Sequence, residues 1–156
     1  MQLAPDFAHV MSALTIWLTD QPNLNWDVIN LGHAPHKLFS PLTELAGHRL
    51  TRAHYFPLTT TALLWSRPGA QRFVQTSGQI FAPVDHFFRK WCATHNGGLD
   101  LSPAIVSPSG APSDIDDTTQ TRQNTGYFWR EFKRQSTTYA YAGYHNIRFK
   151  PFGPQA

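Results

Sequence analysis

The stretch from Leu50 to Val106 constrains the fold of this chain more than any other part of the sequence. Leu58–Trp65 is rich in threonine and is predicted to form a strand that ends at Ser66. Ser66 has a side chain that can cap a helix following directly after it. Pro83–Ala93 has apolar residues at helical spacing, and Leu99–Val106 is typical of another strand. This alternation of strands and helices predicts an α/β fold.

The first third of the chain continues the same alternation. Pro5–Thr19 carries apolar residues at helical spacing, and Trp26–Leu31 is a short, mostly apolar segment that suits the buried middle of a sheet. His33–Gly47 contains two prolines and is predicted to be irregular, whereas His48–Ala53 is predicted to be a strand. Few strands are predicted, and none precedes the first helix. The sheet expected from the sequence is therefore incomplete, with helices on its faces.

A change of composition after residue 107 divides the chain into two parts. Residues 1–107 are predicted to form the folded domain, which suits a chain of 156 residues. Residues 108–156 begin with a run of proline, serine and glycine and are predicted to form a loop and a loosely structured tail. Within that tail, Tyr127–Arg134 is predicted to be a short aromatic and basic helix.

The single cysteine, Cys92, excludes an internal disulfide and fits a reducing compartment. Because it lies in an aromatic helical segment, we expect a buried and inert thiol. No apolar run approaches the roughly 18 to 20 residues that a membrane span requires, and no secretory signal is visible. The net charge of +3 is compatible with a phosphate ligand or an acidic surface but does not establish either.

Four sequence motifs resemble the C-terminal half of the family-25 glycosyltransferases of the lipooligosaccharide-biosynthesis type. They are the opening segment Met1–Phe7, the strand Trp26–Gly32, the segment Leu58–Ala70 with its Ser-Arg-x-Gly-Ala sequence, and the motif Pro83-Val84-Asp85. The resemblance covers roughly residues 1 to 115. The family's Glu-Asp-Asp cluster is not in this chain. We therefore expect a fragment, a start placed at an internal methionine, or the product of a degenerate gene.

The resemblance implies an α/β fold of the GT-A, or nucleotide-diphospho-sugar transferase, type. It implies transfer of a hexose, galactose in particular, from a nucleotide sugar to a lipooligosaccharide or another cell-envelope glycan. The partners would be the donor and the glycan acceptor rather than nucleic acid, and the cofactor would be a divalent cation, Mn²⁺ or Mg²⁺. The location implied is the cytoplasm, at the inner face of the membrane. Whether this chain is an enzyme by itself depends on the missing acidic cluster.

By the same resemblance, Asp85 is the candidate catalytic residue, which would bind the acceptor sugar or take the proton of its hydroxyl. The alternative is that Asp85 only stabilises the start of its helix, as aspartate commonly does in a first turn. The candidate substrate-binding residues are Thr59, Thr60, Thr61, Ser66, Arg67 and His86. For most of these residues the alternative is an ordinary strand or surface position.

Three other features invite functional readings. Asp114–Asp117 has an Asp-x-Asp spacing that suits a hard cation, but a solvated loop is the favoured interpretation. His33 and His36 lack the accompanying ligands of a zinc site, so no metal-ligating residue is predicted. Tyr127–Arg134 could make a binding module for an acidic membrane or single-stranded nucleic acid, but an ordinary terminal helix packed on the domain is the favoured interpretation.

Overall fold

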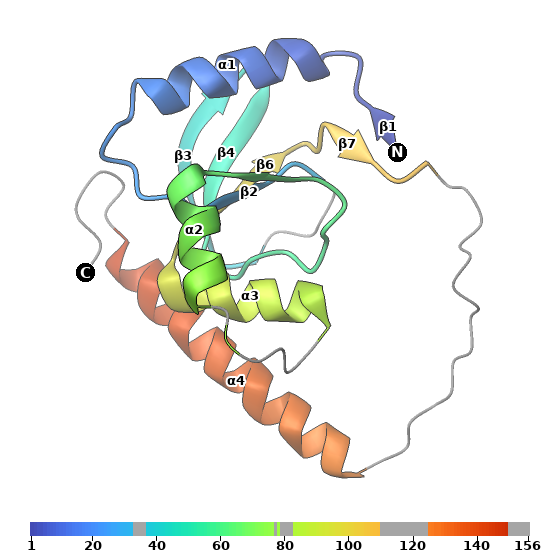
Figure 1. The fold of residues 1–156 in the computed structure, drawn as a ribbon, viewed down its shortest axis with the longest axis vertical. Helices are drawn as coiled ribbons and strands as arrows, with labels where there is room; N and C mark the ends of the chain where they lie inside the picture. Colours follow the sequence, from blue (N-terminus) through green and yellow to red (C-terminus); the bar gives the residue numbers. More distant parts are fainter. Residues whose placement is uncertain (33–36, 77, 79–82, 110–124, 150–156) are drawn as a thin grey trace.

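The computed structural model describes residues 1–32, 37–76, 78, 83–109 and 125–149. They form both strands and helices, so the mixed α/β class expected from the sequence is confirmed (Figure 1). Strict alternation is not found, because four strands follow one another between the first and second helices. In chain order the elements are β1 (Gln2–Leu3), α1 (Phe7–Thr19), β2 (Val28–Asn30), β3 (Phe39–Leu45), β4 (His48–Ala53), β5 (Leu63–Trp65), α2 (Arg67–Thr76), α3 (Val84–His95), β6 (Gly98–Ser102), β7 (Val106–Ser107) and α4 (Thr125–Arg148).

The main sheet has five strands in the order β3-β4-β6-β2-β5. Strands β2 and β6 run parallel, whereas the other neighbours in this sheet are antiparallel. The two-residue strands β1 and β7 pair separately. Because β2 and β6 lie side by side in parallel, their carboxyl ends lie next to each other at the same end of the sheet's strands.

Two apolar cores lie on opposite faces of the main sheet, because successive strand residues point to alternate faces. One core joins Val10 and Leu14 of α1 to Ile29 of β2 and Leu99 of β6. The other core joins Val28, Ala53, Phe56, Trp91 and Cys92 of β2, β4, α3 and the segment after β4, with Phe73 of α2 packed against it. The sheet is thus covered by α1 on one face and by α2 and α3 on the other.

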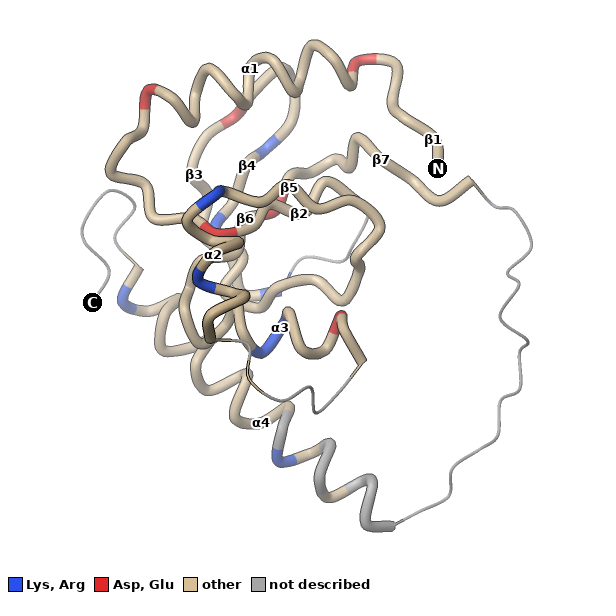
Figure 2. Tube along the Cα trace, in the orientation of Figure 1, with Lys and Arg blue, Asp and Glu red and all other residues tan. Residues whose placement is uncertain are grey.

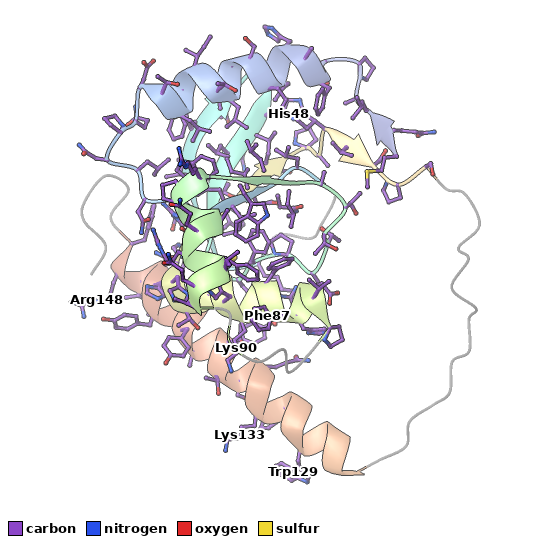
Figure 3. All side chains as sticks on the ribbon, in the orientation of Figure 1. His48, Phe87, Lys90, Trp129, Lys133 and Arg148 are labelled. Carbon is purple, nitrogen blue, oxygen red and sulfur yellow. The ribbon has the colours of Figure 1, made fainter. Side chains whose placement is uncertain are left out.

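Cys92 is fully buried in the second core, and burial raises the pKa of its thiol, as the sequence led us to expect. Helix α1 lies at one border of the molecule and α4 at the opposite border (Figure 1). Side chains fill the space between them, and His48 lies beneath α1 (Figure 3). Within the ranges given above, the structure contains no helix with the length and apolarity needed to cross a membrane.

Four sequence predictions about strands are wrong. The segment expected to be irregular contains β3, which forms a hairpin with β4 through Ala46 and Gly47, both at positive φ. The predicted Thr-rich strand is limited to β5, since Leu58–Ala62 form a loop. The predicted strand at Leu99–Val106 is divided into β6 and β7 around Pro103, which has no amide hydrogen to donate. Finally, β1 precedes the first helix.

The predicted short helix at Tyr127–Arg134 is also wrong in extent, because α4 continues for 24 residues to Arg148. The reason is tertiary packing. Tyr139 stacks on Tyr55 with ring centroids 4.2 Å apart, and Thr138 and Ala142 are buried. Contacts of this kind stabilise a helix that its local sequence signals only weakly indicate.

Candidate functional site

A buried polar pair lies at the carboxyl end of the parallel strands, where the apolar core of the α3 face ends. Asn30 of β2 and Asp100 of β6 are direct neighbours in the parallel register. The Asn30 amide Nδ2 donates to Asp100 Oδ1 at 2.9 Å and to the Gly32 carbonyl at 3.1 Å. The Gly32 amide donates back to Asn30 Oδ1 at 3.2 Å, and Thr51 Oγ1 donates to the Asp100 carbonyl at 3.3 Å. These bonds fix the two side chains side by side.

Burial raises the pKa of the Asp100 carboxyl from 3.8 to about 7, and the hydrogen bond from Asn30 opposes this increase. The cause is desolvation, because a buried carboxyl group loses the water that would stabilise its charged form. A carboxyl group with a pKa close to neutrality can both hold and release a proton under physiological conditions.

We expect this carboxyl group to make the stability of the fold depend on pH. The folded state keeps the Asp100 proton up to about pH 7, whereas the unfolded chain releases it near 3.8, so the folded state binds more protons in that window. The free energy of unfolding should therefore fall as pH rises through it, on the order of 4 kcal/mol for a shift of about three pKa units.

The measurement is urea unfolding of the wild type and of Asp100→Asn at several pH values. The variant should gain stability relative to the wild type as pH rises from acidic to neutral. His54 acts in the opposite direction, since burial lowers its pKa to about 4, but it is present in both proteins and cancels in the difference. A pH-independent difference between the two proteins would contradict the prediction.

The loop between β4 and β5 packs on β6 and on the residues that follow β2. At one end of the loop, Phe56 packs so tightly on Gly98 that a Cβ placed there would lie 2.5 Å from Phe56 Cδ2. At the other end, Thr61 packs on Gly32, where a Cβ would lie 3.2 Å from Thr61 Cβ. Between them, Thr59 Oγ1 is buried and has no hydrogen-bond partner among the residues that the structure describes.

Asp85 lies in the first turn of α3, where its Oδ1 accepts a hydrogen bond of 2.8 Å from the backbone amide of His86. Arg89 lies one helical turn later, on the same face of the helix as Asp85. Its Nε donates to the Phe56 carbonyl at 2.7 Å, and its guanidinium lies 4.2 Å from the centre of the Tyr55 ring. Burial lowers the pKa of Arg89, and the nearby Tyr55 and Asp85 are among the groups that oppose this shift. Arg89 therefore ties the first turns of α3 to the loop between β4 and β5.

Ser66 and Arg67 lie elsewhere, at the amino end of β2. Ser66 Oγ accepts the Gly69 amide at 2.9 Å and donates to the Trp26 carbonyl at 2.9 Å, which confirms the predicted cap. Arg67 is exposed beside it and lines a cavity of about 590 Å³ together with both tryptophans of the region, Trp26 and Trp65. From Trp26 to Asn30 the chain advances about 13 Å at strand spacing, so these two residues do not adjoin the polar pair.

The predicted site residues thus fall into two groups. The structure places Thr59 and Thr61 in the loop between β4 and β5, and Asp85 in the first turn of α3. Thr60 belongs to the same loop but is exposed, and His86 is half-buried next to Asp85. The threonines lie in the loop and not in a strand, so strand alternation does not decide which of them face a ligand.

Sequence reasoning missed Asn30 and Asp100, and it also missed a second buried polar cluster near the start of β2. In that cluster the Arg52 guanidinium is fully buried, and His54 Nδ1 is 2.8 Å from Asn96 Oδ1. Nearby, the buried Asp27 Oδ1 lies 3.2 Å from Arg72 Nη1, and burial raises the pKa of this aspartate while Arg72 opposes the shift. A lone Asp between Leu99 and Leu101 was the one available signal for the polar pair.

Among the residues described, no group of three or more His, Cys, Asp and Glu side chains could hold a metal ion. The segment Asp114–Asp117 and the pair His33 and His36 lie outside the described residues. The part of the chain that the structure describes therefore does not supply the ligands of the divalent cation implied by the family resemblance. Comparison of the chain with family models, with curated proteins and with solved structures found no match.

Proposed function

We propose that this chain is the acceptor-side part of a glycosyltransferase that moves a hexose, galactose in particular, from a nucleotide sugar to a lipooligosaccharide or a related cell-envelope glycan. The proposal is supported by the buried Asn30–Asp100 pair at the carboxyl ends of β2 and β6 and by the packing of Thr61 on Gly32 beside Asn30. It is also supported by the bond from Arg89, one turn after Asp85, to the Phe56 carbonyl of the same loop. Ligands of open α/β sheets bind outside the carboxyl ends of parallel strands. Side-chain amides, hydroxyls and carboxylates are the groups that hydrogen-bond to the hydroxyls of a sugar.

In this proposal Asp85 accepts the proton of the acceptor hydroxyl as that oxygen attacks the anomeric carbon of the donor hexose. The bond from that carbon to the diphosphate oxygen breaks, and the nucleoside diphosphate leaves with its electron pair. Asp85 lies in the first turn of α3, where the backbone amide of His86 holds its carboxylate in place. Thr59 and Thr61 would orient the acceptor. The Asn30–Asp100 pair would hold a sugar hydroxyl at the base of the site. We derive no step through the divalent cation, because the described residues do not provide its ligands.

The first test is binding of the full chain to oligosaccharide released from lipooligosaccharide, measured by isothermal titration calorimetry. Asp85→Asn should weaken binding by at least about tenfold, because a hydrogen bond to a charged group contributes about 1.5 to 3 kcal/mol. Asp20→Asn, at an exposed aspartate after α1, is the control and should bind as the wild type does. Wild-type protein that binds no oligosaccharide would overturn the proposal.

Thr59→Val separates a role in recognition from a role in the fold. Because Thr59 Oγ1 is buried without a partner, its removal should leave the free energy of unfolding unchanged or higher. Binding of the oligosaccharide should nevertheless weaken.

We also expect no robust transfer from UDP-galactose with Mn²⁺ by these residues alone, and rapid metal-dependent turnover would contradict that expectation.

A further inference from the structure

Helix α4 extends past the packed body of the protein. Its C-terminal half packs on the domain through the Tyr139–Tyr55 stack and through the buried Thr138 and Ala142. Its N-terminal half continues beyond the end of α3 at the border of the molecule (Figure 1). Figure 3 shows Trp129 and Lys133 on this projecting half and Arg148 at the other end of the helix.

The outward side of α4 carries a row of apolar residues, interrupted by Lys133 and Ser136, which we call the α4 stripe and define as Trp129, Phe132, Ala140, Tyr144 and Ile147. Neighbouring members of the stripe are three or four positions apart, except that Phe132 and Ala140 are separated by about two helical turns. All five therefore lie on one side of the helix. Trp129 is 65% exposed, Phe132 57% and Ile147 86%. From the first to the last the stripe spans about 27 Å at 1.5 Å per residue. Exposed apolar side chains that gather on one side of an element and are bordered by polar residues mark sites of interaction.

Two shallow hollows along the helix add to this surface. One, of about 500 Å³, is lined by Trp129, Phe132, Lys133, Ser136 and Thr137. The other, of about 610 Å³, is lined by Thr94 of α3 and by Thr137, Ala140, Tyr141, Tyr144 and His145 of α4. They share Thr137 and therefore adjoin each other.

Positive charge accompanies the α4 stripe. The sequence of α4 contains Arg130, Lys133, Arg134 and Arg148 against one acidic residue, Glu131. In Figure 2 the coloured residues of this helix include basic positions and no acidic one. The Arg148 guanidinium donates to the Tyr144 hydroxyl at 2.9 Å and lies 5.4 Å from the centre of that ring, so a cation sits directly on the stripe.

We propose that α4 docks the protein on an anionic membrane surface, with the α4 stripe inserted at the headgroup boundary and Lys133 and Arg148 facing the lipid phosphates. Helices with an aromatic apolar side and flanking Lys or Arg bind in this way, in the plane of the interface. Charge selects this partner over a second copy of the chain, since two copies of α4 would bring like charges together. This surface is independent of the proposed acceptor site.

The test is flotation of the full chain with vesicles of phosphatidylcholine, with and without phosphatidylglycerol. The wild type should float with the anionic vesicles only, and added salt should release it. The double variant Trp129→Ser, Phe132→Ser should lose at least about tenfold in partitioning, because two large apolar side chains leave the interface. Ile16→Ser, at a 62% exposed position on α1, is the matched control and should float like the wild type.

A charge reversal tests the electrostatic part. Lys133→Glu should weaken binding by about fivefold for each unit of charge lost. Arg49→Glu, at an exposed arginine of β4, should have no effect. Light scattering would detect a dimer, and a binding assay with single-stranded DNA would detect a nucleic-acid complex. A dimer, or a nucleic-acid complex, that forms while anionic vesicles leave the protein unbound would overturn the proposal. The proposal would also be overturned if Ile16→Ser lost as much vesicle partitioning as the Trp129→Ser, Phe132→Ser double variant.

Discussion

Arg52→Ala is expected to lower the free energy of unfolding by about 3 to 5 kcal/mol, the largest effect we expect from any single substitution in this protein. The side chain is fully buried in β4. Its Nη1 donates to the Asn96 carbonyl at 2.8 Å, and its Nη2 donates to the Asn25 carbonyl at 2.5 Å. Truncation leaves both carbonyls without their donor and opens a cavity, and each of these changes is costly.

The charge of Arg52 also balances that of Asp27. Burial lowers the pKa of the guanidinium to about 10, and Asp27 opposes this shift, so the group remains protonated at neutral pH. Removing the cation leaves the buried aspartate with Arg72 as its ion-pair partner. Urea unfolding followed by tryptophan fluorescence would measure the loss.

Arg49→Ala is the matched control, because Arg49 belongs to the same strand. Its guanidinium is 56% exposed and lies 3.6 Å from an even more exposed carboxylate of Glu44. Exposed pairs of this kind contribute about 0 to 1 kcal/mol, so the two alanine variants should differ by several kcal/mol. Equal effects of the two substitutions would show that the buried hydrogen bonds of Arg52 contribute little.

Gly69→Ala is expected to cost about 2 to 3 kcal/mol, or roughly 5 to 10 °C in Tm. Gly69 lies in the first turn of α2, directly on the backbone of Asp27. A Cβ on this residue would lie 2.4 Å from Asp27 Cα and 2.6 Å from Asp27 O. Those are backbone atoms, so no side chain can rotate away to make room. The helix would have to move off the sheet and would stretch the Arg72–Asp27 ion pair.

Gly143→Ala is expected to stabilise the protein and serves as the control. Gly143 lies inside α4, and a Cβ there would meet nothing within 4 Å. Alanine is favoured over glycine in a helix by up to about 1 kcal/mol, so this variant should melt at a higher temperature than the wild type. Calorimetric melting of both variants is the measurement. A Gly69→Ala protein as stable as the wild type would contradict the close packing described for α2.

The sequence predicted the elements whose ends have local chemical signals. Ser66 marks the start of α2 through its hydrogen bond to the Gly69 amide, and Asn96, in the left-handed conformation, marks the end of α3. Apolar spacing predicted less well which residues of the helices are buried. Val74 of α2 and Val84 of α3 are apolar, yet they are 76% and 55% exposed, because aromatic rings fill the core beneath these helices.

Elements that depend on distant partners were not predictable in this way. Strand β3 has a mixed and partly exposed sequence, and it exists because β4 supplies its hydrogen-bond partners across a tight hairpin. The same limit applies to the candidate site. Asp85 was recognisable from its motif, whereas Asn30 and Asp100 are separated by 70 positions and become a pair only through the parallel register of β2 and β6.

The hairpin strand β3 has a consequence for how this protein behaves at high concentration. It lies at one edge of the five-stranded sheet, an edge that could serve as a template for fibre growth. Pro41 sits within it, and the register shifts between Pro41 and Thr43, so the edge cannot offer an unbroken row of amide donors. The opposite edge, β5, is only three residues long. Both margins of the sheet should therefore resist amyloid-like strand addition for as long as the native state persists.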